Sequence, residues 1–498
     1  QYRGVFWSQV NAKDWTVLAF LKSEQGGLGL DVGQDKESKE SMLLALGQIM
    51  DQPLEVLWAR RLDGAWFNTL LTGGDPVRDL LQWMDAPAEF RAARDNNAWA
   101  AFLRVCQAQF AFQPKEGELA AAARLAARTG PWALVWERFA EAPARYPNIP
   151  AQIRRCSPPV FDMLTDAATA GGWPQWNDAR EADLRAYLQT LSQQAPHDAR
   201  ATLRRLERDH RQRRDLVWAM LGEAPLALAM EPLARLAEAT GQSLETGTVE
   251  DMQTVYVTTG WQADDAVLRA LEHATSADSL AAISAAIRSV YLPWMMDGAR
   301  RLQALVSASK SPGGVREGKP PAYVARNQCV MFVDGLRFDL GRRLAEMLGT
   351  KGLDVAEHPT WTALPSVTAT GKAAVAPVAE RFAGQPGAED FVPAIVATGA
   401  ALTTQQLRKA LADAGWQVLT GSEVGVPGGQ AWCEFCDIDQ EGHTRGWKLA
   451  LHAQSLLAEI AERVSALLAA GWDQVRVVTD HGWLLLPGNL PKIDLPKA

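Results

Sequence analysis

The sequence predicts an α/β protein in which a parallel or mixed sheet flanked by helices follows a large, mainly α-helical region. Up to about residue 309 apolar residues recur at helical spacing, whereas strand-like and helix-like runs alternate after residue 321. Such alternation is typical of a sheet with helices on its faces. We expect a helical region at 1–309 with room for two subdomains, a linker at 310–321, and an α/β domain at 322–498.

The helical region is predicted from segments with apolar residues three and four positions apart, separated by proline and glycine breaks. The stretch 310–321, KSPGGVREGKPP, has instead the glycine, proline and charge content of an exposed linker. The clearest helical segments are 118–128, 180–191, 201–221 and 277–290.

The α/β region begins with an apolar run of the kind that forms a strand buried on both faces, and this run stops at Asp334. A β-branched strand later in the chain stops at Asp480 and His481. Because ligands bind beyond the carboxyl ends of strands in open α/β sheets, we expect these side chains at one edge. The predicted elements are strands 328–333, 353–356 and 475–479 and helices 336–348, 405–414 and 447–468.

Composition bounds the class of protein. The chain has 498 residues, 47% of them hydrophobic and 22% charged, and a net charge of −8, which is ordinary for a globular protein. We expect no membrane partner, because the longest nearly uncharged run is too short to span a bilayer. Five cysteines without a disulfide pattern, and no visible signal peptide, favour the cytoplasm. The start at Gln1 and the end soon after an apolar run suggest a fragment whose C-terminal domain is truncated.

The acidic residues at the strand ends are candidate metal ligands. Neighbours along a strand point to opposite faces, but at the last residues of a strand Asp480 and His481 can both reach one cation. The alternatives are a buried structural histidine at His481 and, at Asp334, a carboxylate that only caps the following helix. Asp439 and His443, with three residues between them along the chain, suit a carboxylate and an imidazole that share a metal.

Two other motifs carry weaker signals. A lone CxxC at Cys433 and Cys436 lacks the partners of a four-ligand zinc site, so we expect core-facing cysteines. The stretch 364–372, LPSVTATGK, fails as a nucleotide phosphate loop because Ser366 stands where that loop needs glycine. It still offers a hydroxyl at a helix start, Thr368, for which the alternative is an N-cap.

A cluster of arginines lies in the helical region. Such clusters bind phosphate backbones, but acidic residues are interleaved with these, and a solvated helix face is the default alternative. The candidate nucleic-acid contacts are Arg204, Arg205, Arg208 and Arg211.

Taken together, the motifs resemble a known family. Asp334-Gly335, Thr368 after Pro365-Ser366-Val367, Asp439 with His443, and Asp480-His481-Gly482 run in the order of the alkaline phosphatase superfamily, and are most similar to nucleotide pyrophosphatase/phosphodiesterase-like members. The surrounding stretches VDGLRFDLGRRL, LPSVTATG and VVTDHGWLLLP resemble the PglZ domain of BREX phage-resistance systems. The resemblance covers about residues 325–498 and implies an alkaline phosphatase-like core.

The resemblance implies a two-metal site. Asp334, Asp480 and His481 would hold one divalent ion together with the Thr368 oxygen, and Asp439 with His443 would hold the second. Zinc is the ion that mixed carboxylate and imidazole ligands favour, with manganese and magnesium as alternatives. Thr368 would be the nucleophile. The family's phosphate-binding Asn is missing, and its tentative substitutes are Arg337, Thr370 and Lys372.

The expected function is that of a metal-dependent phosphodiesterase or nuclease in bacterial anti-phage defence, acting with other BREX components such as a methyltransferase. Two alternatives stay open: an inactive scaffold for those partners, and a phosphomonoesterase. The family usually supplies a further histidine after the Asp-His-Gly motif, whereas no histidine follows His481 in this sequence. A sulfatase is not expected, because the sequence context of its modified nucleophile is missing.

Overall fold

The computed structural model describes residues 16–24, 26–161, 165–308, 323, 325–385 and 391–488. The chain divides into two compact units. The first comprises the described residues of Gln1–Glu181 and Gln212–Ala224, and the second those of Ala182–Arg211 and Pro225–Ala498. A mixed α/β protein with a small parallel sheet and a large helical region is thereby confirmed.

The first unit is built of helices packed around buried aromatic side chains, among them Phe102, Trp132 and Trp218. Local sequence sets where these helices begin: Asp75 caps the backbone of α6, and Pro76 takes its first position. The helices are α1 (Val17–Lys22), α2 (Lys36–Leu44), α3 (Leu46–Met50), α4 (Leu54–Trp58), α5 (Gly64–Leu71), α6 (Pro76–Asp85), α7 (Pro87–Ala92), α8 (Asn96–Phe110), α9 (Glu118–Ala127), α10 (Trp132–Glu141), α11 (Ile149–Arg155), α12 (Ala167–Ala170) and α15 (Val217–Met220).

The second unit combines helices with the sheet in one hydrophobic core. Leu268 and Ile287 of its helices belong to the same buried cluster as Met331 of the central strand. The linker expected at 310–321 lies outside the described residues, and helices on both sides of it share this core. The helices before it are α14 (Pro196–His210), α16 (Pro225–Ala239), α17 (Val249–Val255), the π-helical turn η5 (Tyr256–Gly260), α18 (Trp261–Leu271) and α19 (Ala277–Ala308), and α13 (Pro174–Thr190) enters this unit from the first.

The sheet has four parallel strands in the order β4-β5-β1-β6, with β1 (Gln328–Asp334) between β5 (Gln430–Asp437) and β6 (Gln474–Val478). Six of the seven β1 residues are buried, which confirms a strand covered on both faces. The remaining elements are β4 (Gln417–Leu419), the two-stranded β2 (Phe382–Ala383) with β3 (Ala394–Ile395), and helices α20 (Phe338–Thr350), α21 (Thr368–Val375), α22 (Thr404–Asp413), α23 (Ile438–Arg445) and α24 (Leu449–Ala469).

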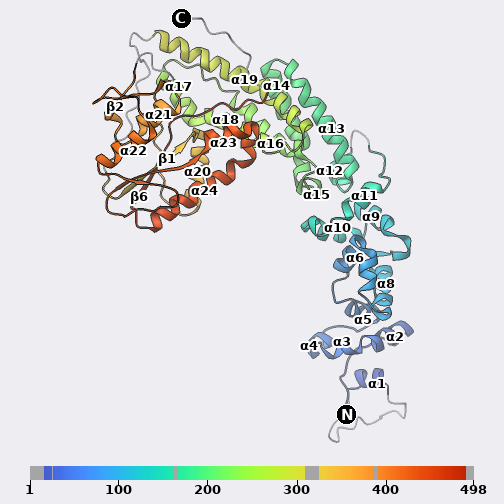
Figure 1. Cartoon of the computed structure of the whole chain (residues 1–498). Coiled ribbons are helices and arrows are strands. Elements are labelled where there is room, and N and C mark those ends of the chain that lie inside the picture. Colours follow the sequence, from blue (N-terminus) through green and yellow to red (C-terminus); the bar gives the residue numbers. More distant parts are fainter. Residues whose placement is uncertain are drawn as a thin grey trace. The chain divides into compact units, whose positions relative to one another are not determined.

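Helices cover the two faces of β1 differently. Met331 packs in the cluster that contains residues of α20 and α24, whereas Phe332 packs with Trp432 and residues of α22. Figure 1 shows α21 and α22 on one side of β1, and α20 and α24 on the other. The site therefore forms where α21 approaches the end of β1.

Several predicted elements need correction. The strand expected at 353–356 is irregular backbone, and the helix expected at 201–221 is interrupted between α14 and α15. Strand β5 was not predicted, because the charged residues Glu434 and Asp437 interrupt the apolar run that would indicate a buried strand. The helices at 405–414 and 447–468 are confirmed within a few residues as α22 and α24.

The strand ends meet as predicted. Asp334 at the end of β1 lies opposite Asp437 at the end of β5, and Phe332 pairs with Val478, two residues before Asp480. The carboxyl ends of three neighbouring strands thus share one edge. Separately, within the described part of the chain no helix is both long and apolar enough to cross a membrane.

Candidate metal centre

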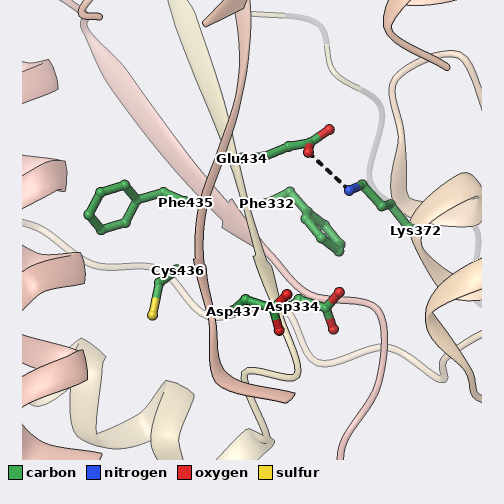
Figure 2. Close-up of a pocket in the computed structure, with 7 residues that line it drawn as sticks. All are labelled: Phe332, Asp334, Lys372, Glu434, Phe435, Cys436 and Asp437. Atoms are coloured by element: carbon green, nitrogen blue, oxygen red, sulfur yellow. Dashed lines mark ion pairs between the residues drawn. The ribbon is translucent and has the colours of Figure 1, made fainter. Parts of the chain in front are cut away.

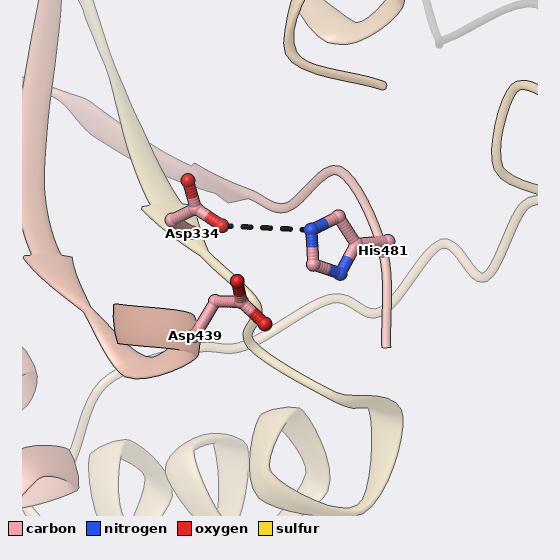
Figure 3. A group of neighbouring side chains, drawn as sticks. All are labelled: Asp334, Asp439 and His481. Carbon is pink, nitrogen blue, oxygen red and sulfur yellow. Dashed lines mark ion pairs between the residues drawn. The ribbon is translucent and has the colours of Figure 1, made fainter. Parts of the chain in front are cut away.

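Four segments converge at this edge of the sheet. Asp334 ends β1, Thr368 begins α21, Asp439 lies in the first turn of α23, and Asp480 with His481 follow β6. Figure 3 shows Asp334, Asp439 and His481 directed toward a common space, each from a different segment. The structure thereby brings together five of the six residues predicted as metal ligands.

The hydroxyl of Thr368 lies close to two members of this group. Its Oγ1 is 3.0 Å from Nε2 of His481 and 3.5 Å from Oδ1 of Asp334. The N-cap of α21 is Val367, which makes no side-chain capping bond, and Thr368 is the first helical residue. Its hydroxyl therefore faces the strand ends, and the N-cap alternative for Thr368 is wrong.

The ring of His481 is oriented by the backbone. Nδ1 lies 3.1 Å from the carbonyl oxygen of Gly482, and a carbonyl can only accept a hydrogen bond. Nδ1 therefore donates this bond, and in the tautomer that the bond favours Nε2 is the nitrogen able to accept a hydrogen bond or to hold a cation. Nε2 lies 3.7 Å from Oδ1 of Asp334 and 3.6 Å from Oδ2 of Asp480. Histidines that bind metals are commonly oriented in this way.

The side chain of Asp480 is buried, and within the described part of the chain only one of its two carboxylate oxygens accepts hydrogen bonds. Its Oδ1 accepts hydrogen bonds from the amides of Gly335 at 3.2 Å and of His481 at 3.0 Å. Its backbone carbonyl accepts the hydroxyl of Thr362. Among the described residues none donates to its buried Oδ2. A buried carboxylate oxygen without a partner is costly, so this atom is suited to a cation.

Asp439 joins the group, whereas His443 stays at its margin. Ligand atoms of Asp334, Asp439 and His481 all lie within 4.8 Å of one another. Nε2 of His443 lies 3.2 Å from Oδ2 of Asp439, yet the His443 side chain is 76% exposed. His443 thus reaches the cluster through Asp439, as the outer member of an i, i+4 pair on α23.

Two glycines allow the segments to approach. Gly335 has a φ of +66°, and a Cβ there would lie 2.9 Å from Cβ of Asp439. A Cβ on Gly371 would lie 2.7 Å from the carbonyl oxygen of Asp480 and 2.8 Å from its Cβ. Both positions therefore exclude a side chain. The absence of a Cβ at Gly335 lets Asp439 approach the site, and its absence at Gly371 does the same for Asp480.

The carboxylates of the cluster repel one another, which shows in their pKa values. Burial raises the pKa of Asp334 to about 7, with further increases from the charges of Asp480, Asp437 and Asp439, against a lowering by His481. Burial likewise raises the pKa of Asp480. Carboxylates gathered at this distance repel one another, and a divalent ion removes that repulsion.

The donor set fits a divalent ion. Carboxylate oxygens from Asp334, Asp439 and Asp480 and a neutral imidazole nitrogen from His481 are ligand types that zinc accepts, and manganese accepts them too. The unpartnered Oδ2 of Asp480 and the fixed Nδ1 proton of His481 agree with this use.

A cavity of about 230 Å³ adjoins Asp334. Figure 2 shows Asp334, Asp437, Phe332 and the ion pair between Glu434 and Lys372 around it. Nζ of Lys372 lies 3.1 Å from Glu434 and 4.7 Å from the centre of the Phe332 ring. Lys372 therefore lines the space beside Asp334 with its charge balanced by Glu434.

Two of the tentative phosphate contacts are engaged elsewhere. Arg337 is 4% exposed, and its guanidinium donates to both carboxylate oxygens of Asp339, which corrects its expected role at a phosphate. The hydroxyl of Thr370 donates to the carbonyl of Phe391 at 3.1 Å. Lys372 alone of the three lines the cavity next to Asp334.

The arginines and the CxxC cysteines lie on different elements: the arginines belong to α14 and the turn after it, whereas the cysteines lie on β5, where Cys436 lines the cavity beside Asp334. The four arginines of the candidate nucleic-acid face are exposed on or just after α14, and Arg205 forms an ion pair with Asp209 at 3.2 Å. Cys433 is buried, as expected, whereas Cys436 is half-buried.

Sequence reasoning missed Glu434, Asp437 and Trp483. The indole nitrogen of Trp483 donates to the carbonyl of Gly335 at 2.7 Å, across 148 residues of chain. Only recognition of β5 as a strand would have indicated that Asp437 ends beside Asp334. No local sequence pattern predicts the hydrogen bond between Trp483 and Gly335.

No protein-family model, curated protein or solved structure matches this chain. What the strand-end cluster does is therefore inferred from its own side chains.

Proposed function

We propose that the chain is a metal-dependent phosphoesterase, a phosphodiesterase or nuclease with an alkaline phosphatase-like core, in which Thr368 is the nucleophile. The observation that carries the proposal is the position of the Thr368 hydroxyl, 3.0 Å from Nε2 of His481 and 3.5 Å from Oδ1 of Asp334. A threonine that only capped α21 would instead turn its oxygen toward backbone amides.

The residues that would hold metal ions are those of the cluster. Asp334, Asp480 and His481 would hold one ion with the Thr368 oxygen, and Asp439 with His443 would hold a second. A bound divalent ion supplies positive charge that favours the Thr368 alkoxide and neutralises the phosphoryl oxygens. Zinc is the proposed ion, with manganese and magnesium as alternatives.

The chain's own groups serve the first chemical step. Oγ1 of Thr368 bonds to phosphorus while the bond to the leaving oxygen breaks, and the leaving group departs as an alcohol after taking a proton from water. Nε2 of His481 and Oδ1 of Asp334, both close to Oγ1, would hold the ion, so the hydroxyl proton of Thr368 would pass to solvent water. The amino end of α21 favours the negative phosphoryl group placed before it.

Water completes the reaction. It attacks the phosphorus bound to Thr368, the bond to Oγ1 breaks, and Thr368 regains its proton. With a diester the product is a phosphomonoester, and with a monoester it is phosphate. The cavity of about 230 Å³ beside Asp334, with Lys372 at its wall, gives room for the second substituent of a diester, which favours the diester over the monoester.

The setting of this activity is proposed from the motifs. Their resemblance to PglZ domains supports a cytoplasmic role in bacterial anti-phage defence together with other BREX components. The exposed Arg204, Arg205, Arg208 and Arg211 support contact with nucleic acid.

A scaffold without activity is the second candidate. The exposure of His443, 76%, favours it, because an outer ligand pair open to water holds an ion less firmly than a buried one. Partner docking would then be the function, with the strand-end cluster binding metal weakly or not at all.

Hydrolysis of bis-p-nitrophenyl phosphate by the zinc- or manganese-loaded chain tests the proposal. We expect turnover that Thr368→Ala and Asp334→Asn each lower by about a hundredfold or more, because each removes a group that acts at the reacting centre. Ser366→Ala, an exposed hydroxyl two residues before Thr368, is the matched control and should keep the activity. Turnover that persists in both site variants contradicts the proposal, and absence of metal binding by the unaltered chain favours the scaffold.

A further inference from the structure

Arg337 occupies a buried position between helix α18 and the two loops that carry the candidate ligands. Its Nε donates to Oδ1 of Asp339 at 2.6 Å, and its Nη2 donates to Oδ2 at 2.8 Å. Nη2 also donates to the carbonyl of Asp264 on α18 at 3.2 Å. A bidentate pair of this kind fixes the plane of the guanidinium.

On the helical side, Asp264, which Arg337 contacts, is itself held by two tyrosines. The carboxylate of Asp264 accepts hydrogen bonds from the hydroxyl of Tyr256 at 2.6 Å and from the hydroxyl of Tyr291. Tyr256 belongs to the π-helical turn η5, and Tyr291 to α19. Burial alone would lower the pKa of Arg337, but Asp339 and Asp264 raise it, so the guanidinium stays charged.

On the site side, Arg337 is bound to the segment that carries Asp480 and His481. Its guanidinium carbon lies 4.0 Å from the centre of the Trp483 ring, and Nη1 donates to the Trp483 carbonyl at 3.3 Å. Trp483 in turn donates to the carbonyl of Gly335 at 2.7 Å, next to Asp334. The amide of Leu336 donates to the hydroxyl of Thr479 at 3.0 Å.

The ligands Asp334 and Asp480 are thus joined behind the site by one set of contacts. Asp334 is three residues before Arg337, and His481 is two residues before Trp483. Gly482 allows this approach, because a Cβ there would lie 3.2 Å from Cγ of Arg337. The stack of Arg337 on Trp483 is one of the contacts that join the two ligand loops, together with the hydrogen bonds to Asp480, Thr479 and Gly335.

We infer that Arg337 and Trp483 are positioning residues: through them the turn η5 and helices α18 and α19 hold the two ligand loops at the distance that a shared cation requires. The inference rests on the proposed metal site for its functional meaning, and on the contacts above for its geometry. It assigns the helices before residue 309 in the second unit to the construction of the site. Residues 322–498 would then be insufficient to hold the ligand loops in place.

Arg343 provides a matched control. It lies on α20, is also buried, and also binds α18, through the carboxylate and the carbonyl of Asp265 and through Glu272 at 3.1 Å. Its hydrogen-bond partners among the described residues, Asp265 and Glu272, belong to the helical part and not to the ligand loops. A loss of α18 contact alone would therefore affect Arg343 and Arg337 variants alike.

The test compares Arg337→Lys, Trp483→Phe and Arg343→Lys in the full chain. Trp483→Phe keeps an aromatic ring under Arg337 and removes only the bond to Gly335. We expect the affinity for Zn²⁺, measured by titration calorimetry, to fall about tenfold or more in the first two variants and to stay within about twofold in Arg343→Lys. Equal losses in all three variants, or unchanged affinity in Arg337→Lys and Trp483→Phe, would overturn the inference.

Amide hydrogen exchange separates this inference from the proposed function. In the metal-free chain we expect faster exchange of peptides covering 328–340 and 476–486 in Arg337→Lys and Trp483→Phe, and not in Arg343→Lys. If the unaltered chain binds no Zn²⁺, the proposed function fails, and this exchange pattern alone decides whether Arg337 positions the loops. Exchange of both peptides that matches the unaltered chain would refute the positioning role.

Discussion

At the scale of single residues, the site depends as much on missing side chains as on ligands. Gly335 and Gly371 each stand where a Cβ would meet an acidic residue of the cluster at less than 3.0 Å. Thr368 adds its hydroxyl because the neighbouring Val367, which cannot cap, takes the N-cap position. The proposed chemistry therefore rests on close backbone approach between α21, β1 and the segment after β6.

Gly371→Ala should separate α21 from Asp480 and so displace the Thr368 hydroxyl from the candidate ligands. We expect Zn²⁺ affinity and phosphodiester turnover to fall about tenfold or more, because a small misplacement at a reacting centre is costly. Gly341→Ala is the control, since Gly341 lies in α20 with nothing within 4 Å of its added Cβ. Alanine there should preserve function and slightly stabilise the helix. Equal Zn²⁺ affinity in the two variants would contradict the role of Gly371.

At the scale of elements, three parallel strands end together, and helix starts complete the site. This much was predictable, because an apolar run that stops at a carboxylate is a local signal, and parallel strands end at a common edge. The contact of Arg337 with Asp264 was not predictable, because Asp264 lies 73 residues earlier in the chain. Strand β5 escaped notice because Glu434 and Asp437 break the apolar pattern that marked β1 and β6.

Asp439 and His443 of helix α23 should contribute unequally to Zn²⁺ affinity. A carboxylate oxygen of Asp439 lies within 4.8 Å of ligand atoms of Asp334 and His481, whereas the His443 side chain is 76% exposed. Asp439→Asn should therefore lower Zn²⁺ affinity by about tenfold or more, and His443→Gln by clearly less, since exposed partners contribute little. Calorimetric titration of both variants measures this. A larger loss in His443→Gln would instead indicate that the ion binds at the outer pair.

At the scale of the whole molecule, the chain has two compact units with separate cores. The sequence predicts a change from helical periodicity near residue 309, and the first strand of the sheet, β1, begins at Gln328. Periodicity could not indicate that α16 to α19 share a core with the sheet, because spacing reveals that a helix has an apolar face and not what covers that face. The helices of the second unit therefore count toward the site, although the sequence suggested a separate region.

Separate cores predict separate effects on stability. Phe139→Ala, in the core of the first unit, should cost about 3–5 kcal/mol of unfolding free energy in that unit and leave Zn²⁺ affinity unchanged. Leu268→Ala, in the core of the second unit, should cost about 2–5 kcal/mol and also weaken Zn²⁺ binding. Urea unfolding followed by titration calorimetry compares them. Loss of Zn²⁺ affinity in Phe139→Ala would contradict the assignment of the site to the second unit alone.

The central claim is that Thr368 bonds to phosphorus during turnover, and trapping that bond tests it most directly. Zinc-loaded chain is mixed with bis-p-nitrophenyl phosphate, quenched in acid, digested and examined by mass spectrometry. We predict a p-nitrophenyl phosphoryl group on Thr368 and none in Thr368→Val, which should also lose turnover. A phosphoryl group on another residue, or full turnover by Thr368→Val, would contradict the claim.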